Sequence, residues 1–362
     1  MSPASSPATG PLTCLVVGPD EHGVVVEALR QHAALVSAGA SSGADAHLVR
    51  LPARPTPPQL LGALLDAPPG PVLVHVTDKL FGASALEAAD VLEALAAQRR
   101  LVVALHDLPQ ASDGAVNHPR RTRGYARIAR ASAAVVVASR HEARLLAACG
   151  VSPEEVPVAV VPLPVPELPR TVAPDPRAPL KAVAVLGYLY PGKGHDDVVA
   201  ALDALPPGAG LLAWGTPSSG HDDLVDALAA QAATLGRTVE VTGWVPDEAL
   251  PALLRSAVVP VAPHAHLSAS GSINLWVAAG RRPLVPRSDY AEELLERSPG
   301  CVAVYDDLPA ALAAAWADPA STWAGPSAGG SHPSPTAHDG AVLVRRVVDG
   351  LDGLDGPDGG VA

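Results

Sequence analysis

Residues 182–202 read AVAVLGYLYPGKGHDDVVAAL, and this stretch decides the fold of the half of the chain that contains it. Its opening apolar run, without polar alternation, is typical of a strand buried on both faces. The run leads to Gly187, then to a loop with Gly192, Lys193 and Gly194, then to a segment with helical spacing. Glycines let backbone N–H groups approach an anion, a helix N-terminus adds positive potential, and lysine adds a point charge. The stretch therefore predicts a strand–loop–helix unit that binds phosphate.

Two other interpretations of this loop remain open. Gly187, Gly192 and Lys193 satisfy most of the P-loop pattern of nucleoside triphosphatases. That pattern needs Ser or Thr after the lysine to hold magnesium, and this chain has Gly194 there. No later apolar strand ends in the acidic residue that would complete such a metal site. The other interpretation is a glycine turn with a solvated lysine.

Similar apolar runs alternate with helical segments along both halves of the chain. The expected strands are 14–17, 47–51, 72–76, 101–105, 134–138 and 158–161, then 182–186, 210–213, 239–241, 258–262, 284–285 and 302–304. Expected helices include 121–132, 247–255 and 341–351. Strand–helix alternation is the pattern of an α/β fold with doubly wound parallel sheets. In such sheets, ligands bind outside the carboxyl ends of the strands.

Prolines separate the two halves. Residues 162–179 contain seven prolines, which lack the N–H that a sheet needs and favour a semi-rigid linker. We expect an N-terminal acceptor-side domain at 1–165, a linker at 166–179 and a C-terminal nucleotide-binding domain at 180–324. A flexible loop at 325–340 should lead to a helix at 341–352 that packs back on the N-terminal domain. The last residues, 353–362, should form a disordered tail.

Composition narrows the class of protein. Hydrophobic residues make up 48% of the chain and aromatic residues 3%, and the formal net charge is −12. An acidic chain with few aromatic rings suits neither phosphate neutralisation nor base stacking, so we expect no nucleic-acid partner. The three cysteines are widely spaced, and the N-terminus lacks the features of a signal peptide. No apolar run is long enough to span a membrane, and we expect a soluble, cytoplasmic protein.

Several segments, in this order, resemble family 4 of the retaining glycosyltransferases. The lysine–glycine motif at Lys193 precedes an acidic, apolar helix, as in that family. The other similar segments are 16–31 (the first glycine loop), 103–111 (the strand-end histidine), 135–151 (a strand, a serine and a helix), 241–263 (the base-binding segment) and 268–285 (the donor-binding loop and helix). The resemblance implies the GT-B fold, in which two Rossmann-like domains face each other across a cleft.

The resemblance also implies a donor site in the second domain. The Lys193 loop would bind the diphosphate of a nucleotide sugar, and the backbone at Gly243, Trp244 and Val245 would contact the base. The donor would be a UDP- or GDP-sugar. The sugar would be transferred with retention, and no metal or other cofactor would be obligatory.

Two departures from the family pattern fall in this donor site. The donor-binding helix of the family carries two glutamates eight positions apart, and this chain has Leu267 and Leu275 in those places. The arginine that follows the family glycine is replaced by Tyr188. The usual site therefore lacks one cation and two carboxylates here.

Polar residues nearby could compensate for these losses. Ser270, Gly271 and Ser272, at the start of an expected helix, offer hydroxyl and N–H groups to a pyrophosphate. Asn274 could reach a ribose or sugar hydroxyl. The alternative for the serines is an ordinary helix cap.

Candidate residues in the first domain lie at strand ends. His106 follows an expected strand and, by resemblance, would contact the donor sugar near the reacting carbon, whereas the alternative is a histidine satisfied by a neighbouring carbonyl. His75 and Asp78 could border the acceptor. Gly23 could let the first loop approach the acceptor or the phosphate, or could simply form a turn.

Two further groups favour a structural interpretation. His264 and His266 form an HxH pair without a third metal ligand, so we expect no metal site. Five arginines are clustered at 120–130, which is typical of a solvated face, although they could attract an anionic, lipid-linked acceptor.

The sequence thus predicts a glycosyltransferase of the hexosyltransferase type that moves a sugar from a nucleotide donor to an acceptor hydroxyl. Lys193 and His106 are its predicted catalytic residues. The acceptor would be a sugar, a lipid-linked compound or a natural product in polysaccharide or glycoconjugate biosynthesis, and peripheral membrane contact would be compatible with it. Two alternatives stay open: a non-catalytic binding or partner subunit with the same fold, and a sugar-nucleotide epimerase.

Overall fold

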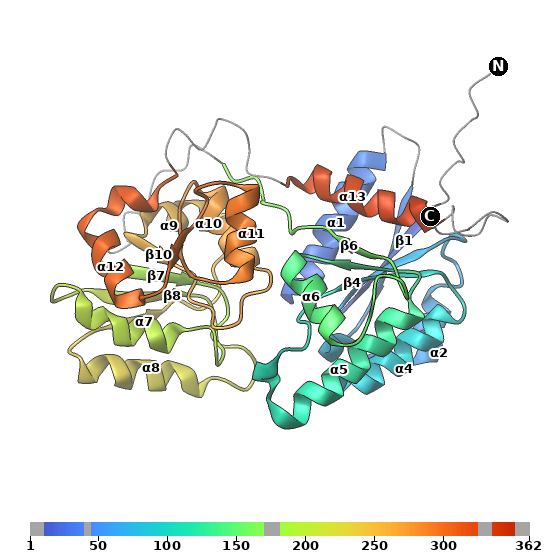
Figure 1. Cartoon of the computed structure of the whole chain (residues 1–362), viewed down its shortest axis with the longest axis horizontal. Coiled ribbons are helices and arrows are strands. Elements are labelled where there is room, and N and C mark those ends of the chain that lie inside the picture. Colours follow the sequence, from blue (N-terminus) through green and yellow to red (C-terminus); the bar gives the residue numbers. More distant parts are fainter. Residues whose placement is uncertain (1–10, 40–44, 170–181, 325–334, 352–362) are drawn as a thin grey trace, which may run out of the picture. The chain divides into compact units, whose positions relative to one another are not determined.

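The chain forms two compact units, each built around one parallel sheet (Figure 1). The computed structural model describes residues 11–39, 45–169, 182–324 and 335–351. Described residues up to Pro162 and from Ala337 onward form unit 1, and those from Leu163 to Thr336 form unit 2.

Unit 1 contains a six-stranded sheet in the order β2-β1-β3-β4-β5-β6. Its strands are β1 Leu12–Val17, β2 Ala46–Leu51, β3 Val72–Val76, β4 Leu101–Leu105, β5 Ala134–Val137 and β6 Val158–Val160. Its helices are α1 Gly23–Gly39, α2 Pro57–Ala63, α3 Asp78–Phe81, α4 Ala85–Ala96, α5 Gly114–Ala131, α6 Arg140–Ala148 and α13 Ala337–Gly350, with a 3₁₀ turn η1 at Ala111–Asp113. All pairings are parallel, as the apolar runs predict.

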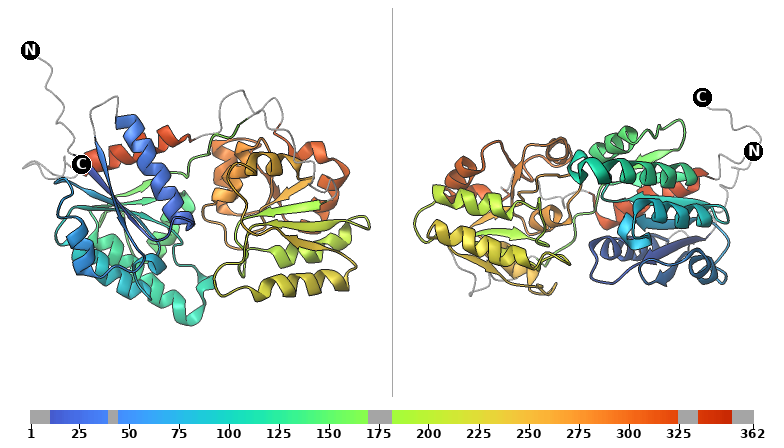
Figure 2. Two further views of the ribbon diagram at one scale, coloured as in Figure 1. Left: turned by 180° about the vertical axis from the view of Figure 1, so that it is seen from behind. Right: turned by 90° about the horizontal axis from the view of Figure 1, so that it is seen from below.

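The central strands β1, β3, β4 and β5 of unit 1 are buried because helices cover both faces of the sheet. On one face, Leu12, Leu73 and Ala104 form a cluster with residues of α1 and α13. On the other, Val72 and Val74 pack with residues of α2, α4 and α5. Helices α1 and α13 lie side by side although they come from opposite ends of the chain (Figures 1 and 2).

Two expectations about helices in unit 1 are corrected. The final helix begins at Ala337 rather than 341, because Gly340 is buried within it and close packing outweighs the poor helix propensity of glycine. Helix α5 begins at Gly114 rather than 121 and contains Pro119. Proline removes one backbone donor, and its position near the exposed N-terminal end keeps that loss small. Residues 170–179, 325–334 and 353–362 of the expected linker, loop and tail lie outside the described residues.

Unit 2 contains a second six-stranded parallel sheet, in the order β12-β11-β10-β7-β8-β9. Its strands are β7 Ala182–Leu186, β8 Gly210–Trp214, β9 Val239–Val241, β10 Val259–Val261, β11 Leu284–Pro286 and β12 Ala303–Tyr305. Its helices are α7 His195–Ala201, α8 Asp223–Thr234, α9 Leu250–Ser256, α10 Gly271–Ala278, α11 Asp289–Arg297 and α12 Leu308–Ala317, with 3₁₀ turns η2 at Leu202–Ala204 and η3 at Pro319–Thr322. Helix α9 starts at Leu250 and is shorter than the expected 247–255 at its N-terminal end.

The boundary between the units precedes the expected one at 165. The side-chain amide of Asn274 in α10 donates to the carbonyls of Leu163 (2.9 Å) and Pro164 (3.2 Å). These bonds attach the first proline-rich residues to unit 2. No helix in the described part of the chain is long and apolar enough to cross a membrane.

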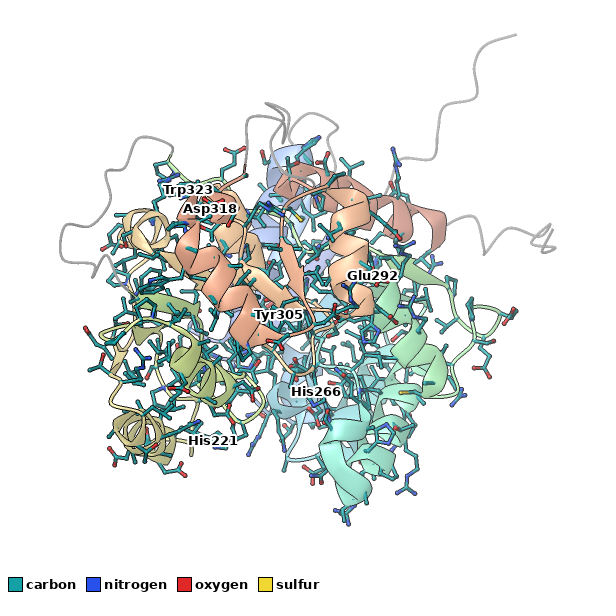
Figure 3. All side chains as sticks on the ribbon, turned by 60° about the vertical axis from the view of Figure 1, so that its left-hand side comes forward. His221, His266, Glu292, Tyr305, Asp318 and Trp323 are labelled. Carbon is teal, nitrogen blue, oxygen red and sulfur yellow. The ribbon has the colours of Figure 1, made fainter. Side chains whose placement is uncertain are left out.

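Arg281 connects several elements at one end of unit 2 through hydrogen bonds. This side chain is 1% exposed and donates from Nη1 to the carbonyls of Leu254 (3.2 Å) and Ala257 (2.6 Å), where α9 ends and β10 begins. It also donates from Nη2 to Oγ1 of Thr322 (2.8 Å). Its guanidinium lies 4.2 Å from the ring centroid of Trp323, which follows η3 and is labelled in Figure 3. Carbonyls at a helix C-terminus attract a cation, so Arg281 connects α9 to η3 although burial lowers its pKa to about 10.

We expect Arg281→Met to lower the free energy of unfolding by about 3 kcal/mol, because the carbonyls around it would be buried without a donor. Arg281→Lys should recover only part of this loss, since lysine lacks the planar fork of donors. Urea unfolding followed by tryptophan fluorescence measures the change. The control is the neighbouring, half-buried Arg282→Met, and equal losses in the two methionine variants would contradict this role.

Candidate functional site

The strand order of unit 2 creates a crevice between β7 and β10. From β7 the chain proceeds to β8 and β9 on one side, and then returns to β10 on the other side of β7. The loops that leave the carboxyl ends of β7 and β10 therefore diverge, which is where open α/β sheets bind ligands. The loop after β7 carries Lys193, and the loop after β10 carries His264.

Glycines allow these two loops to pack closely against each other. Gly194 has φ +85°, and a Cβ there would lie 2.3 Å from the carbonyl oxygen of Pro263. The amide of Ala265 donates to the carbonyl of Gly192 at 3.0 Å. At Gly187, a Cβ would come 3.2 Å from Nζ of Lys193, so the absent side chain leaves room for the ammonium group.

Lys193 is a buried amine with no counter-charge in the described part of the chain. Its side chain is 4% exposed, and Nζ lies 2.6 Å from Nε2 of His264 and 3.5 Å from Oγ of Ser272. Among the described residues, no carboxylate is paired with this lysine. Burial lowers the pKa of Lys193 to about 7. A neutral or half-protonated lysine in this position would gain charge when an anion arrives.

Two histidines share the surroundings of Lys193. Burial, and then the charge of Lys193, hold the pKa of His264 well below its usual range and lower that of His195 to about 3. Nε2 of His195 is buried and has no hydrogen-bond partner among the described residues. The three groups thus form a nitrogen-rich cluster at the β7–β10 crevice, and their chemistry suits an anion.

The N-terminus of α10 completes this cluster. Oγ of Ser270 accepts from the amide of Ile273 at 3.3 Å, so Ser270 is the helix cap that one sequence interpretation proposed. Oγ of Ser272 lies 3.0 Å from Oγ of Ser270 and within reach of Lys193. Gly271 is exposed, and a Cβ there would meet nothing within 4 Å. The helix therefore offers a hydroxyl and a positive end beside the lysine.

The two leucines at the glutamate positions of the family are apolar packing residues. Leu267 is 5% exposed and clusters with Ile273 and Tyr290. Leu275 packs against the cluster that contains Trp214 and Trp276. Neither position therefore has a carboxylate that could take the role of the missing glutamate.

Other donor-site candidates in unit 2 differ in their freedom to bind. Trp244 follows β9 and is 58% exposed, whereas Val245 packs partly into the sheet. Gly243 has φ +73°, which favours glycine. The amide nitrogen of Asn274 donates to the carbonyls of Leu163 and Pro164, and the contact of Asn274 with a ribose or sugar hydroxyl stays a prediction.

Two histidines of unit 1 meet at the carboxyl edge of its sheet. His75, in β3, lies with Nδ1 3.0 Å from Nε2 of His106, which follows β4. Nε2 of His75 lies 2.7 Å from Oε1 of Gln31 in α1. The alternative of a carbonyl partner for the His106 ring is replaced by this histidine pair. Burial lowers the pKa of His106 to about 4, while Asp107 opposes that change and His22 adds to it.

The remaining candidates of unit 1 have mostly structural contacts. Gly23 is the first residue of α1, and a Cβ there would meet no protein atom within 4 Å, so its approach to an acceptor or phosphate stays a prediction. Asp78 is buried and lies 3.6 Å from Arg121. Within the arginine cluster, Arg127 pairs with Glu93 at 2.6 Å, and such pairs favour the solvated-face interpretation. Two other arginines of the cluster have comparable partners, namely Asp113 for Arg121 and Glu155 for Arg130.

No group of three or more potential ligands among the described residues could hold a metal ion. His264 is buried beside Lys193, whereas His266 is exposed (Figure 3). The sequence analysis missed His264 as a partner of Lys193, and it missed Gln31 entirely. A signal for His264 existed, because the strand before it had to lie near β7 for the crevice to form.

We expect Lys193→Met to stabilise the unliganded protein, raising its melting temperature by about 3 °C near pH 7. The pKa of Lys193 is about 7 in the folded state, below the value of about 10.4 for an unfolded lysine. Between these values the unfolded chain binds more protons, so wild-type stability rises with pH and the advantage of the variant shrinks. Thermal melts across this range test the difference, with the exposed Lys79→Met as control. A variant less stable than the wild type at pH 7 would contradict the burial cost.

Comparisons with known proteins identify the fold. No protein-family model and no curated protein matches the sequence. Solved structures do match. Anabaena HepE in complex with UDP and glucose aligns with a TM-score of 0.65 and 16% identity, over 95% of this chain and 99% of that chain. Sucrose-phosphate synthase from Thermosynechococcus elongatus gives 0.66 and 17%, over 94% and 95%.

A third match has the same extent. AviGT4, a glycosyltransferase involved in Avilamycin A biosynthesis, aligns with a TM-score of 0.56 and 18% identity, over 94% of this chain and 97% of that chain. Each match spans both units rather than a single Rossmann-like domain. The fold expected from the sequence is confirmed: this chain has the GT-B fold of the glycosyltransferases that it resembles.

Proposed function

We propose that this protein is a glycosyltransferase that moves a sugar from a nucleotide donor to an acceptor hydroxyl, with retention and without an obligatory metal. The observation that carries the proposal is Lys193, a buried amine without a carboxylate partner among the described residues, at the β7–β10 crevice. A structural lysine at this depth would need a counter-charge, because an unpaired buried ion is costly. A diphosphate would provide that counter-charge.

The chemistry follows from the same cluster. When the sugar leaves, negative charge develops on the diphosphate, and Lys193 with the α10 N-terminus would stabilise it. Ser272 would add a hydroxyl donor, since its Oγ lies 3.5 Å from Nζ of Lys193. The buried setting strengthens these interactions because water does not screen them.

Other candidates have narrower roles in the proposal. The backbone at 243–245 would bind the base, and the exposed ring of Trp244 would lie beside it. Neutral His106 would orient the donor sugar through a hydrogen bond. HepE was solved with UDP-glucose, which makes UDP-sugars the first donors to test.

One observation favours a second candidate function. Leu267 and Leu275 are apolar packing residues where the resembled family has glutamates, and a chain without those carboxylates could bind nucleotide without transferring sugar. This candidate is a GT-B partner subunit. The cost of keeping Lys193 buried argues that anion binding, at least, is retained in it.

We expect calorimetry to detect binding of one of UDP, GDP, ADP and TDP, and Lys193→Met to weaken it by about 1.5–3 kcal/mol, the range of a charge-assisted contact. Wild-type affinity should fall as pH rises above about 7, approaching tenfold per unit, because the free lysine must take up a proton to bind. The variant should lose this pH dependence. Lys79→Met is the control. If the nucleotide affinity of the folded protein depends neither on pH nor on Lys193→Met, the proposed site is contradicted.

Product analysis separates the candidate functions. With a nucleotide sugar and a panel of acceptor sugars, a transferase should release nucleoside diphosphate and form a glycoside that retains the anomeric configuration. An epimerase should instead convert the nucleotide sugar without any acceptor. Selective binding with neither product would favour the partner subunit. NMR of the sugar anomeric protons distinguishes the three results.

A further inference from the structure

Three side chains of unit 1 form a continuous row from α1 to the end of β4. Oε1 of Gln31 lies 2.7 Å from Nε2 of His75, and Nδ1 of His75 lies 3.0 Å from Nε2 of His106. The two imidazole planes differ by 22°, so the facing nitrogens can share a hydrogen bond. Gln31 and His75 are buried, at 8% and 7% exposed. The buried bond between Gln31 and His75 cannot exchange its partners for water without opening the packing around α1, whereas His106 is half-buried.

The bonding capacity of each atom fixes the direction of the row. The amide oxygen of Gln31 only accepts, so Nε2 of His75 must carry a proton. A neutral imidazole carries one proton, and therefore Nδ1 of His75 accepts from Nε2–H of His106. His106 then has its proton on Nε2 and a lone pair on Nδ1. The amide at one end of the row thus sets the tautomer at the other end.

Neutral rings are a requirement of this argument, and the surroundings meet it. Burial holds the pKa of His75 well below its usual range, and the neighbouring His106 lowers it further. His106 faces His22 and Asp107, which have opposite effects on its pKa, and burial outweighs both. His22 itself accepts from the amide of Val24 at 3.2 Å through Nδ1. Both members of the histidine pair are therefore neutral at physiological pH.

The backbone at His106 is held as firmly as its ring. The hydroxyl of Tyr125 donates to the carbonyl of His106 at 2.9 Å, and Arg121 donates to the carbonyl of Asp107. Asp107 has φ +51°, a conformation that aspartate adopts more readily than most residues but still at a cost. Arg121 is anchored in turn by Asp113 at 2.6 Å. With backbone and ring both fixed, the tautomer is what decides which polar group His106 offers.

We propose that Gln31 and His75 are positioning residues that fix His106 as the Nε2-protonated tautomer, so that its Nδ1 accepts a hydrogen bond from a sugar hydroxyl. The second half of this statement rests on the proposed function, whereas the tautomer itself does not. A hydroxyl can donate or accept, so the opposite tautomer would still bind a sugar but with the bond reversed. Fixing the tautomer removes that ambiguity and orients the sugar in one way.

The tautomer is measured directly on the unliganded protein labelled with ¹⁵N-histidine. Two-bond ¹H–¹⁵N spectra distinguish a protonated from an unprotonated ring nitrogen, and His106→Gln assigns the signals. We expect His106 to show protonated Nε2 and unprotonated Nδ1. Protonated Nδ1 on His106 in the wild type would overturn the proposal, whatever the activity of the protein.

Substitutions at Gln31 test the cause. Gln31→Met keeps the length of the side chain and removes the acceptor, so His106 should become a mixture of tautomers. Gln31→Glu keeps an acceptor oxygen and should restore the wild-type tautomer at about pH 8.5, where both rings are neutral. The exposed Gln98→Met is the matched control. A wild-type tautomer in Gln31→Met would overturn the role of Gln31.

Kinetics then test the consequence for transfer. Gln31→Met should lower kcat about tenfold while changing nucleotide affinity less than twofold, and Gln31→Glu should recover kcat at high pH. An unchanged kcat in Gln31→Met with a mixed tautomer would overturn the sugar contact. If no nucleotide binds to the wild type, the proposed function fails while the spectra still decide the tautomer.

Discussion

A lysine amine buried against an imidazole, without a carboxylate partner among the described residues, is the constraint on which unit 2 depends. Lys193 and His264 come from the loops after β7 and β10, and their 2.6 Å contact joins the two sides of the crevice. The glycines around them follow from this contact, because Gly187 leaves space for Nζ and Gly194 lets the loops approach each other. Burying this amine therefore costs the free protein stability, and the proposed diphosphate ligand would offset that cost.

Unit 1 also buries polar side chains at the carboxyl edge of its sheet, but these side chains are neutral. His75 and His106 lie on the α1 face of the sheet, in line with Leu73 and Ala104, and burial keeps both rings uncharged. A buried neutral imidazole can still bind specifically, provided that its tautomer is defined by a partner. Gln31 supplies that partner from the helix that packs on this face. At the carboxyl edge of its sheet, unit 2 thus has a buried amine, Lys193, that becomes a cation on protonation. At the same edge, unit 1 has a neutral imidazole, His106, with a defined acceptor nitrogen.

The sequence predicted the features that depend on local pattern. The strands β3, β4 and β7 were predicted with their observed bounds, because parallel strands buried on both faces are uniform apolar runs. The Lys193 loop was predicted because glycine, lysine and a following helix are adjacent in the chain. Features that depend on contacts between distant residues were missed. Gln31 is 44 residues from His75, and Asn274 is 111 residues from the carbonyl that it binds, so no spacing rule indicates either contact.

Leu267 and Leu275 leave no carboxylate at the two positions where the resembled family has glutamates. A carboxylate near a buried lysine would keep that lysine charged in the free protein, because an opposite charge raises the pKa of an amine. Among the described residues no carboxylate is paired with Lys193, and burial lowers its pKa to about 7. In the proposed function, the ligand would supply the negative charge. In the proposed function, nucleotide binding would therefore be coupled to proton uptake by Lys193.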